Sequence, residues 1–137
     1  MKSSKRQNLI TVASIPNRTF TSLSGGEKSG STNNWYDGGS TVPSVVGAPP
    51  ETGEITLTNA FDPEIDAPLL QTLKAQVNIL RTTITRAHLA GDMTRVAAAK
   101  PDVWTDALLT SVTPPEADAN SGDVATYELK FKPADLT

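Results

Sequence analysis

Few side chains in this sequence could do catalytic chemistry. His88 is the only histidine among the 137 residues, and its neighbours Ala87 and Leu89 offer it neither a charge partner nor a proton relay. A general base or a nucleophilic triad would therefore depend on this one residue. No serine lies in a G-x-S-x-G nucleophile motif. The pattern favours a histidine on a strand surface over a catalytic base.

Two groups of carboxylates could bind a metal ion or transfer protons. Glu116 and Asp118 would point the same way in an extended chain, an arrangement used for acid–base catalysis and for calcium. They lead into turn residues, where acidic side chains are usually solvated. Asp62, Glu64 and Asp66 form the second group, which the start of a helix explains through capping and the helix dipole. We predict Asp62 as one helix cap and Asp66 as the N-cap of a second helix start.

Other patterns exclude further kinds of site. Residues 25–32, GGEKSGST, lack the G-x-x-x-x-G-K-[ST] order of a phosphate loop. The chain has no cysteine, so it has no disulfide, thiolate zinc site or cysteine nucleophile. We therefore expect neither an enzyme nor a bound cofactor or metal.

Charge and hydropathy limit the possible partners. The chain has 12 basic and 15 acidic residues, a net charge of −3, which argues against binding nucleic acid through clustered Lys and Arg. No apolar run approaches the roughly 20 residues that span a bilayer, so we expect no membrane anchoring. The basic start is followed by NLITVASIPN, too short and interrupted for a signal peptide, and we expect no export. The length predicts a single domain over residues 1–137.

Alternating hydrophobicity predicts about six strands and one helix. The residue pattern has period two in Glu54–Phe61 and in Val124–Lys132, where Ala125 is also expected to face inward. A helical stripe follows Asp66. The other predicted strands are Leu9–Ala13, Arg18–Leu23 across an Ile15–Asn17 turn, Val77–Leu89 and Val103–Thr113. The predicted core contains Leu57, Phe61, Leu70, Leu73, Tyr127, Leu129 and Phe131. The fold class is mainly β with one short α-helix.

A long arm interrupts this β-domain. Residues 25–50 are rich in Gly, Ser and Pro, which favour a flexible, extended segment. Structureless connections longer than about 12–15 residues are uncommon and usually functional or disordered. Trp35 and Tyr36 are costly to leave in water, and aromatic residues anchor protein contacts. We expect the arm to contact a neighbouring molecule through residues that include Trp35, Tyr36, Asp37, Gly38, Gly39, Pro49 and Pro50.

The order of several segments resembles the small tail tube proteins of tailed bacteriophages. The similarity covers about Asn8 to Pro133 and rests on WYDGG in the arm, GEITLTNAFDP leading into the helix, and SVTPPEADANSGDVATYELKF near the end. This resemblance implies two packed antiparallel sheets that form a sandwich-like barrel. It also implies hexameric rings that stack into a tail tube, with the arm reaching an adjacent subunit or ring.

The same resemblance implies a set of partners and a location. The partners would be other copies of the chain, the tape measure protein, tail terminator and baseplate proteins and, in contractile particles, a sheath protein. DNA would be a transient cargo in the lumen. The protein would be assembled in the host cytoplasm and lie in the virion tail.

Two alternatives remain open from the sequence. A tube protein of a contractile injection or secretion system would share the fold. A β-sandwich carbohydrate-binding module would use exposed aromatic residues, here Trp35, Tyr36 and Trp104. The absence of an export signal and the location of the aromatic pair in the arm argue against the second alternative. The strand face that would line a lumen stays undecided between Arg81–Arg86 and the outer face of Val124–Lys132.

Overall fold

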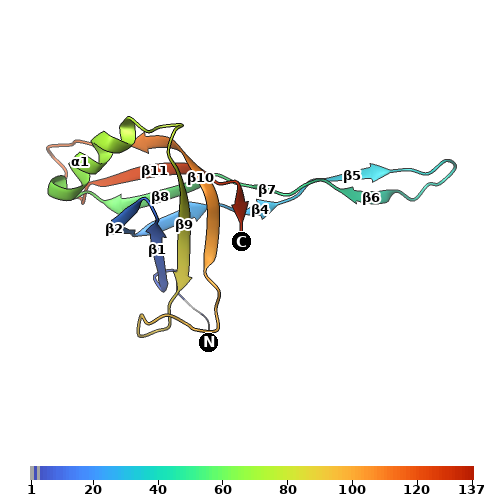
Figure 1. Ribbon diagram of the computed structural model, residues 1–137, viewed down its shortest axis with the longest axis horizontal. Helices are drawn as coiled ribbons and strands as arrows, with labels where there is room; N and C mark the ends of the chain where they lie inside the picture. The colour runs from blue at the N-terminus through green and yellow to red at the C-terminus, as the bar shows by residue number, and fades with distance from the viewer. Residues whose placement is uncertain (1, 3) are drawn as a thin grey trace.

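A curled antiparallel sheet forms the body of the molecule (Figure 1). The computed structural model describes residue 2 and residues 4–137. The strand order is β2-β1-β9-β10-β11-β8-β3, and β12 pairs with β10. The strands of the body are β1 (Asn8–Val12), β2 (Ile15–Phe20), β3 (Ser22–Gly25), β8 (Ile55–Ala60), β9 (Arg81–His88), β10 (Asp102–Thr113), β11 (Thr126–Lys132) and β12 (Asp135–Leu136). The expected mainly β fold with antiparallel sheets and one helix is confirmed.

The two ends of the sheet meet because they are consecutive along the chain. β2 and β3 are separated only by Thr21, whose backbone N–H donates to the carbonyl of Thr58 on β8 at 3.1 Å. The side-chain amide of Asn59 donates to the carbonyl of Thr19 on β2 at 3.1 Å. The sheet therefore curls until β2 approaches β8, and it encloses one hydrophobic core.

The core is built by strands whose side chains alternate between two faces. In the register of β8 with β11, Leu57 lies opposite Leu129 and Ile55 lies opposite Phe131. All four side chains are fully buried. Leu70 and Leu73 of the helix and Tyr127 of β11 are also buried, whereas Phe61 packs at the margin of the core. Ala125 was expected to face inward, but it is exposed because β11 begins only at Thr126.

One helix, α1 (Pro63–Lys74), covers part of this core. Asp62 is its N-cap, and the Asp62 side chain accepts the backbone N–H of Glu64 at 3.1 Å. The expected second start at Asp66 is wrong, since Asp66 lies inside the single helix and is buried. Pro68 is the sixth residue of the helix and lies beyond its first turn, so its missing N–H removes one helical hydrogen bond, the one to the carbonyl of Glu64.

Several predicted strand boundaries differ from the structure. The predicted strand Arg18–Leu23 is divided at Thr21 between β2 and β3, because the chain passes there from one end of the sheet to the other. The first hairpin turns at Ala13 and Ser14, and Ile15 lies in β2 opposite Val12 because its apolar side chain is buried in the core. Residues 75–79 form a turn after the helix, so the strand predicted from Val77 begins only at Arg81 as β9. Asn78 adopts a φ of 64°, a conformation that Asn tolerates better than most residues, and its N–H donates to the carbonyl of Leu109 at 2.7 Å.

The arm is a β-hairpin rather than the structureless segment expected from its composition. Near the body, β4 (Lys28–Ser29) pairs with β7 (Glu51–Thr52). Farther out, β5 (Thr32–Trp35) pairs with β6 (Ser44–Gly47). The ribbon extends away from the body (Figure 1). Backbone hydrogen bonds along both pairs explain how a segment rich in Gly and Ser stays extended.

Candidate functional site

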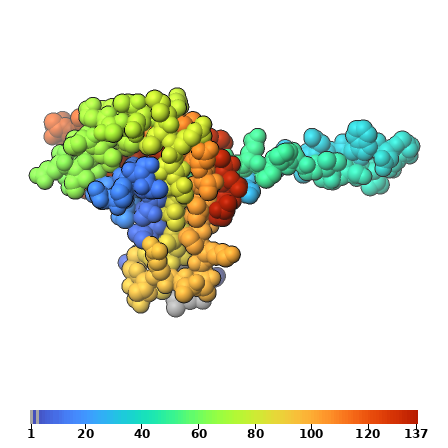
Figure 2. All heavy atoms as spheres, viewed as in Figure 1, coloured from blue at the N-terminus to red at the C-terminus, as the bar shows by residue number. Residues whose placement is uncertain are grey.

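The projecting hairpin is the candidate functional site of this protein. It leaves the body after β3 and returns at β8, and Figure 2 shows it as a narrow extension with the rest of the chain gathered on one side. Its tip is the connection of residues 36–43 between β5 and β6. Asp37, Gly38 and Gly39 lie in this tip, where the N–H of Ser40 donates to the carbonyl of Asp37 at 2.9 Å. Pro49 and Pro50 lie farther back, between β6 and β7.

The base of the hairpin is fixed to the body by a buried tryptophan. The indole N–H of Trp104 on β10 donates to the carbonyl of Gly26 at 2.8 Å. Gly26 has a φ of 77°, and a Cβ added there would lie 2.7 Å from the indole nitrogen of Trp104. Only glycine fits this position without strain. Trp104 is 2% exposed, so it cannot belong to the exposed aromatic platform considered for carbohydrate binding.

Two lysines add polar contacts at the same base. Lys28 lies 3.0 Å from the Asp135 carboxylate, and hydrogen bonding by Lys28 holds the pKa of Asp135 below its usual value. Lys132 on β11 donates to the carbonyl of Thr52 at 2.6 Å. Contacts from β10, β11 and β12 therefore hold both strands of the hairpin where they leave the body.

The outer half of the hairpin exposes an unusual amount of apolar surface. Of the ten large hydrophobic residues that are exposed in the described part of the chain, five lie between residues 35 and 46. They are Trp35, Tyr36, Val42, Val45 and Val46. Trp35 is 64% exposed and Val42 is 75% exposed. Exposed apolar groups that gather in one place are typical of interaction surfaces.

This apolar surface lies on both faces of the ribbon. Residues opposite each other in an antiparallel pair share a face, and successive residues alternate. Trp35 lies opposite Ser44, and Val46, opposite Asn33, shares that face. Val45 lies opposite Asn34 on the other face. A ribbon with apolar side chains on two faces can bury all of them only if it has contacts on both sides.

The residues considered for catalysis are not assembled into a recognisable catalytic group. His88 lies 3.6 Å from the Asp102 carboxylate, a partner contributed by β10 that its sequence neighbours did not supply. Asp102 is already hydrogen-bonded to Arg86, which stacks over the ring of Trp104 at 5.4 Å. This arrangement has the character of a structural ion pair.

The acidic residues considered for metal binding also have structural contacts. Asp118 accepts the backbone N–H of Asn120 at 3.0 Å, and Glu116 is exposed in the same loop. Among the residues that the structure describes, no group of three or more His, Asp or Glu side chains is placed to hold a metal ion. Within the same residues, no helix has the length and apolar character needed to cross a membrane.

Sequence reasoning missed a buried polar cluster beneath the helix. Asp66 accepts hydrogen bonds from Arg18 at 2.8 Å, from the backbone N–H of Asp62 at 2.7 Å and from the Tyr127 hydroxyl at 3.3 Å. Burial raises the pKa of Tyr127. The one available signal was Asn59, a polar residue at an inward position of β8, which donates toward the Tyr127 hydroxyl at 3.5 Å.

The fold is similar to solved structures from contractile injection systems. A chain of the PVC sheath–tube complex, an extracellular contractile injection system in the extended state, has a TM-score of 0.79 at 22% identity, over 99% of this chain and 90% of that chain. A chain of the PVC sheath/tube terminator has a TM-score of 0.77 at 22% identity, and the match covers 100% of this chain and 96% of that chain. Hcp1 from Flavobacterium johnsoniae has a TM-score of 0.51 at 17% identity, over 96% and 93%.

These similarities establish the fold of the chain. No protein-family model and no curated protein sequence matches it. The structural matches extend over nearly the whole chain, arm included, and they come from tube-containing injection particles. The chain therefore has the fold found in chains of contractile injection systems, which supports the broader expectation of a tube fold but not its assignment to bacteriophages.

Proposed function

We propose that this protein is a structural tube subunit of a contractile injection particle. Copies would join into rings, the expected number being six, and the rings would stack into a tube. The observation that carries the proposal is the hairpin of residues 28–52, which exposes apolar side chains on both faces of its outer half and projects from a body with the fold of injection-system chains. Such an arm has its use in contacts with other subunits.

The energetics of the arm favour a closed assembly over a simple dimer. Complete burial of a fully exposed large apolar side chain contributes about 1.5–3 kcal/mol; the five residues of the arm are 52–75% exposed, so together they could contribute roughly 5–9 kcal/mol. The loss of translational and rotational freedom on association costs about 4–15 kcal/mol. The gain from one arm contact is therefore close to the cost of association. In a closed ring each subunit makes several such contacts but loses its translational and rotational freedom only once.

The partners of such a tube follow from the proposal. We infer contacts with other copies of the chain, with a sheath protein, with a terminator and with a baseplate. Similar structures carry the names of a sheath, a terminator and a baseplate. A bacteriophage tail tube that passes DNA and a tape measure protein is the narrower version of the proposal. The similar structures favour the injection-particle version.

Electron microscopy of the purified protein tests this proposal. The full chain should form rings or tubes as its concentration rises. A variant in which residues 30–50 are replaced by an Asn-Gly turn keeps the Ser29–Glu51 pair, and it should form no tubes. Full-length protein that stays monomeric at all concentrations in sedimentation experiments, or a truncated variant that forms normal tubes, would overturn the proposal.

Point variants provide a matched control for the truncation. Trp35→Ser and Val45→Ser each remove apolar surface from one face of the arm and should reduce tube formation. Ile79→Ser removes a side chain that is 72% exposed but lies on the body, and it should leave tubes intact. Equal effects of the arm and body variants would mean that the arm has no special part in assembly.

A further inference from the structure

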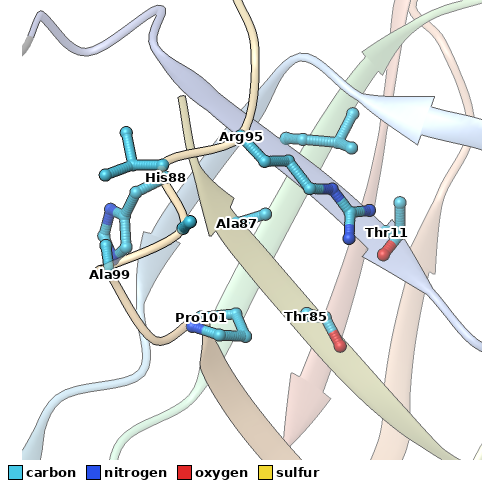
Figure 3. Close-up of a pocket in the computed structure, with 10 residues that line it drawn as sticks. Thr11, Thr85, Ala87, His88, Arg95, Ala99 and Pro101 are labelled. Carbon is cyan, nitrogen blue, oxygen red and sulfur yellow. The ribbon is translucent and has the colours of Figure 1, made fainter. Parts of the chain in front are cut away.

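A small pocket lies in the body, away from the arm. It has a volume of about 220 Å³ and is formed by β1, β9 and the loop of residues 89–101. Its apolar walls include Ala87, Val96, Ala97 and Pro101, and two basic residues, Arg95 and His88, also line it. Figure 3 shows the Arg95 side chain extending toward Thr11, with His88 and Ala99 on the other side. The pocket thus combines an apolar floor with positive charge.

The loop over this pocket has a defined backbone. Leu89 and Arg95 form an isolated β-bridge, and the N–H of Ala90 donates to the carbonyl of Thr94 at 2.7 Å. The N–H of Val96 donates to the carbonyl of His88 at 3.2 Å. These bonds hold the backbone of Arg95 at the pocket. Arg95 makes no ion pair with the other residues that the structure describes, so its charge is available to a partner.

The size of the pocket indicates what could occupy it. Small-molecule sites usually have volumes of about 300–1,000 Å³, so this pocket is small for a cofactor or substrate. One aromatic side chain is a better fit. An arginine beside the pocket would also attract the face of an aromatic ring and a neighbouring carboxylate.

The tip of the arm carries this combination of groups. Tyr36 is 57% exposed at the end of β5, and Asp37 follows it directly. Lys2, near His88 and Val96 in an adjoining hollow, adds a second positive charge on the body side. In Figures 1 and 2 the arm points away from the body, so the tip of one chain is remote from the pocket of the same chain. The tip and the pocket can meet only between two copies.

We propose that the pocket beside Arg95 receives the arm tip of a second copy of this chain. The Tyr36 ring enters between the apolar walls, and the Asp37 carboxylate faces Arg95. This inference rests on the proposed tube function, because it names the surface on which the arm of one subunit lands. It turns a general contact between subunits into a specific pair of surfaces.

Disulfide cross-linking tests the pair directly, since the chain has no cysteine of its own. Asp37→Cys and Ala97→Cys are introduced into separate proteins, which are mixed, allowed to assemble and mildly oxidised. We expect a cross-linked dimer in the mixture, and none from either variant alone. The control pairs Asp37→Cys with Thr72→Cys, an exposed position on α1, and should give no dimer.

Charge exchange gives a second test that is independent of oxidation. Asp37→Arg and Arg95→Asp each place like charges at the contact, and each should raise the protein concentration needed for assembly by roughly tenfold or more. The double variant restores opposite charges and should return that concentration toward the starting value. Lys100→Asp changes a charge in the same loop outside the pocket and should have little effect.

The outcomes separate this inference from the proposed function. One outcome is that tubes form while the cysteines introduced at positions 37 and 97 give no cross-link, or while the cysteines at positions 37 and 72 do. Either result would overturn the inference about the landing site and leave the tube function standing. Failure of the double charge variant to recover assembly would also count against the landing site. Unmodified protein that never assembles would overturn both proposals.

Discussion

Asp66 shows how a single residue can connect distant parts of the chain. Its carboxylate is fully buried, and Arg18 reaches it from β2, 48 residues earlier in the sequence. Tyr127 reaches it from β11. Buried charges are tolerated when they are paired and hydrogen-bonded. The cluster therefore joins the helix to both of these strands.

Neutralising Asp66 should weaken the fold. Asp66→Asn leaves the Arg18 guanidinium without a charged partner, and the loss of hydrogen bonds to a charged group costs about 1.5–3 kcal/mol. We expect a decrease of that size in the free energy of unfolding, measured by urea denaturation. Glu64→Gln, an exposed change in the same turn of the helix, should alter it by less than about 0.5 kcal/mol. Equal midpoints for the two variants would contradict this account of the cluster.

At the scale of elements, the direction of the arm is set where β3 meets β4. Gly25 and Gly26 both have positive φ, and the Gly26 carbonyl accepts the buried Trp104 indole N–H. The ribbon thus leaves the body at a fixed place, and in the proposed assembly less freedom would be lost when its tip binds.

Replacing Gly26 should disturb this junction. In Gly26→Ala the new Cβ would lie 2.7 Å from the Trp104 indole nitrogen and 2.8 Å from Ile55 Cγ1, at a strained φ. We expect a destabilisation of about 1–3 kcal/mol, seen as a lower midpoint of thermal unfolding. Gly38→Ala, where a Cβ meets nothing within 4 Å, is the matched control and should change stability by less than about 1 kcal/mol. An unchanged midpoint for Gly26→Ala would contradict this account, because it would mean that the backbone at the junction shifts to accommodate the new Cβ.

For the whole molecule, the residues that form the core are separate from those that we propose for assembly. The hydrophobic core contains no residue from the outer hairpin, whose apolar side chains are exposed instead. The body is closed by its own strands, and the outer part of the arm adds nothing to its core. In the proposed tube, this division would let each subunit fold before it assembles.

This division predicts that the body folds without the outer arm. The variant with residues 30–50 replaced by an Asn-Gly turn should unfold at nearly the same temperature as the full chain, because no core contact is removed. Circular dichroism at concentrations where both proteins are monomeric measures this. A midpoint lower by many degrees would mean that the arm takes part in folding the body.

Local patterns predicted a large part of the fold. The alternation in Ile55–Ala60 and Thr126–Lys132 and the apolar stripe of the helix each lie within one short segment, and the structure contains these elements. Asp62 likewise caps the helix through a contact two residues away. Such signals are readable because their physical cause is confined to neighbouring residues.

The sequence by itself determined a mainly β chain with one capped helix and an arm carrying an exposed aromatic pair. Tertiary structure alone decided that the arm is a ribbon, that Trp104 is buried at its base, that Asp66 pairs with Arg18, and that Arg95 lies at a pocket. Each of these depends on how separate segments come together. The pairing of Thr32 with Gly47 and the bond from Trp104 to Gly26 are set by strand register and sheet curvature, which no single segment encodes.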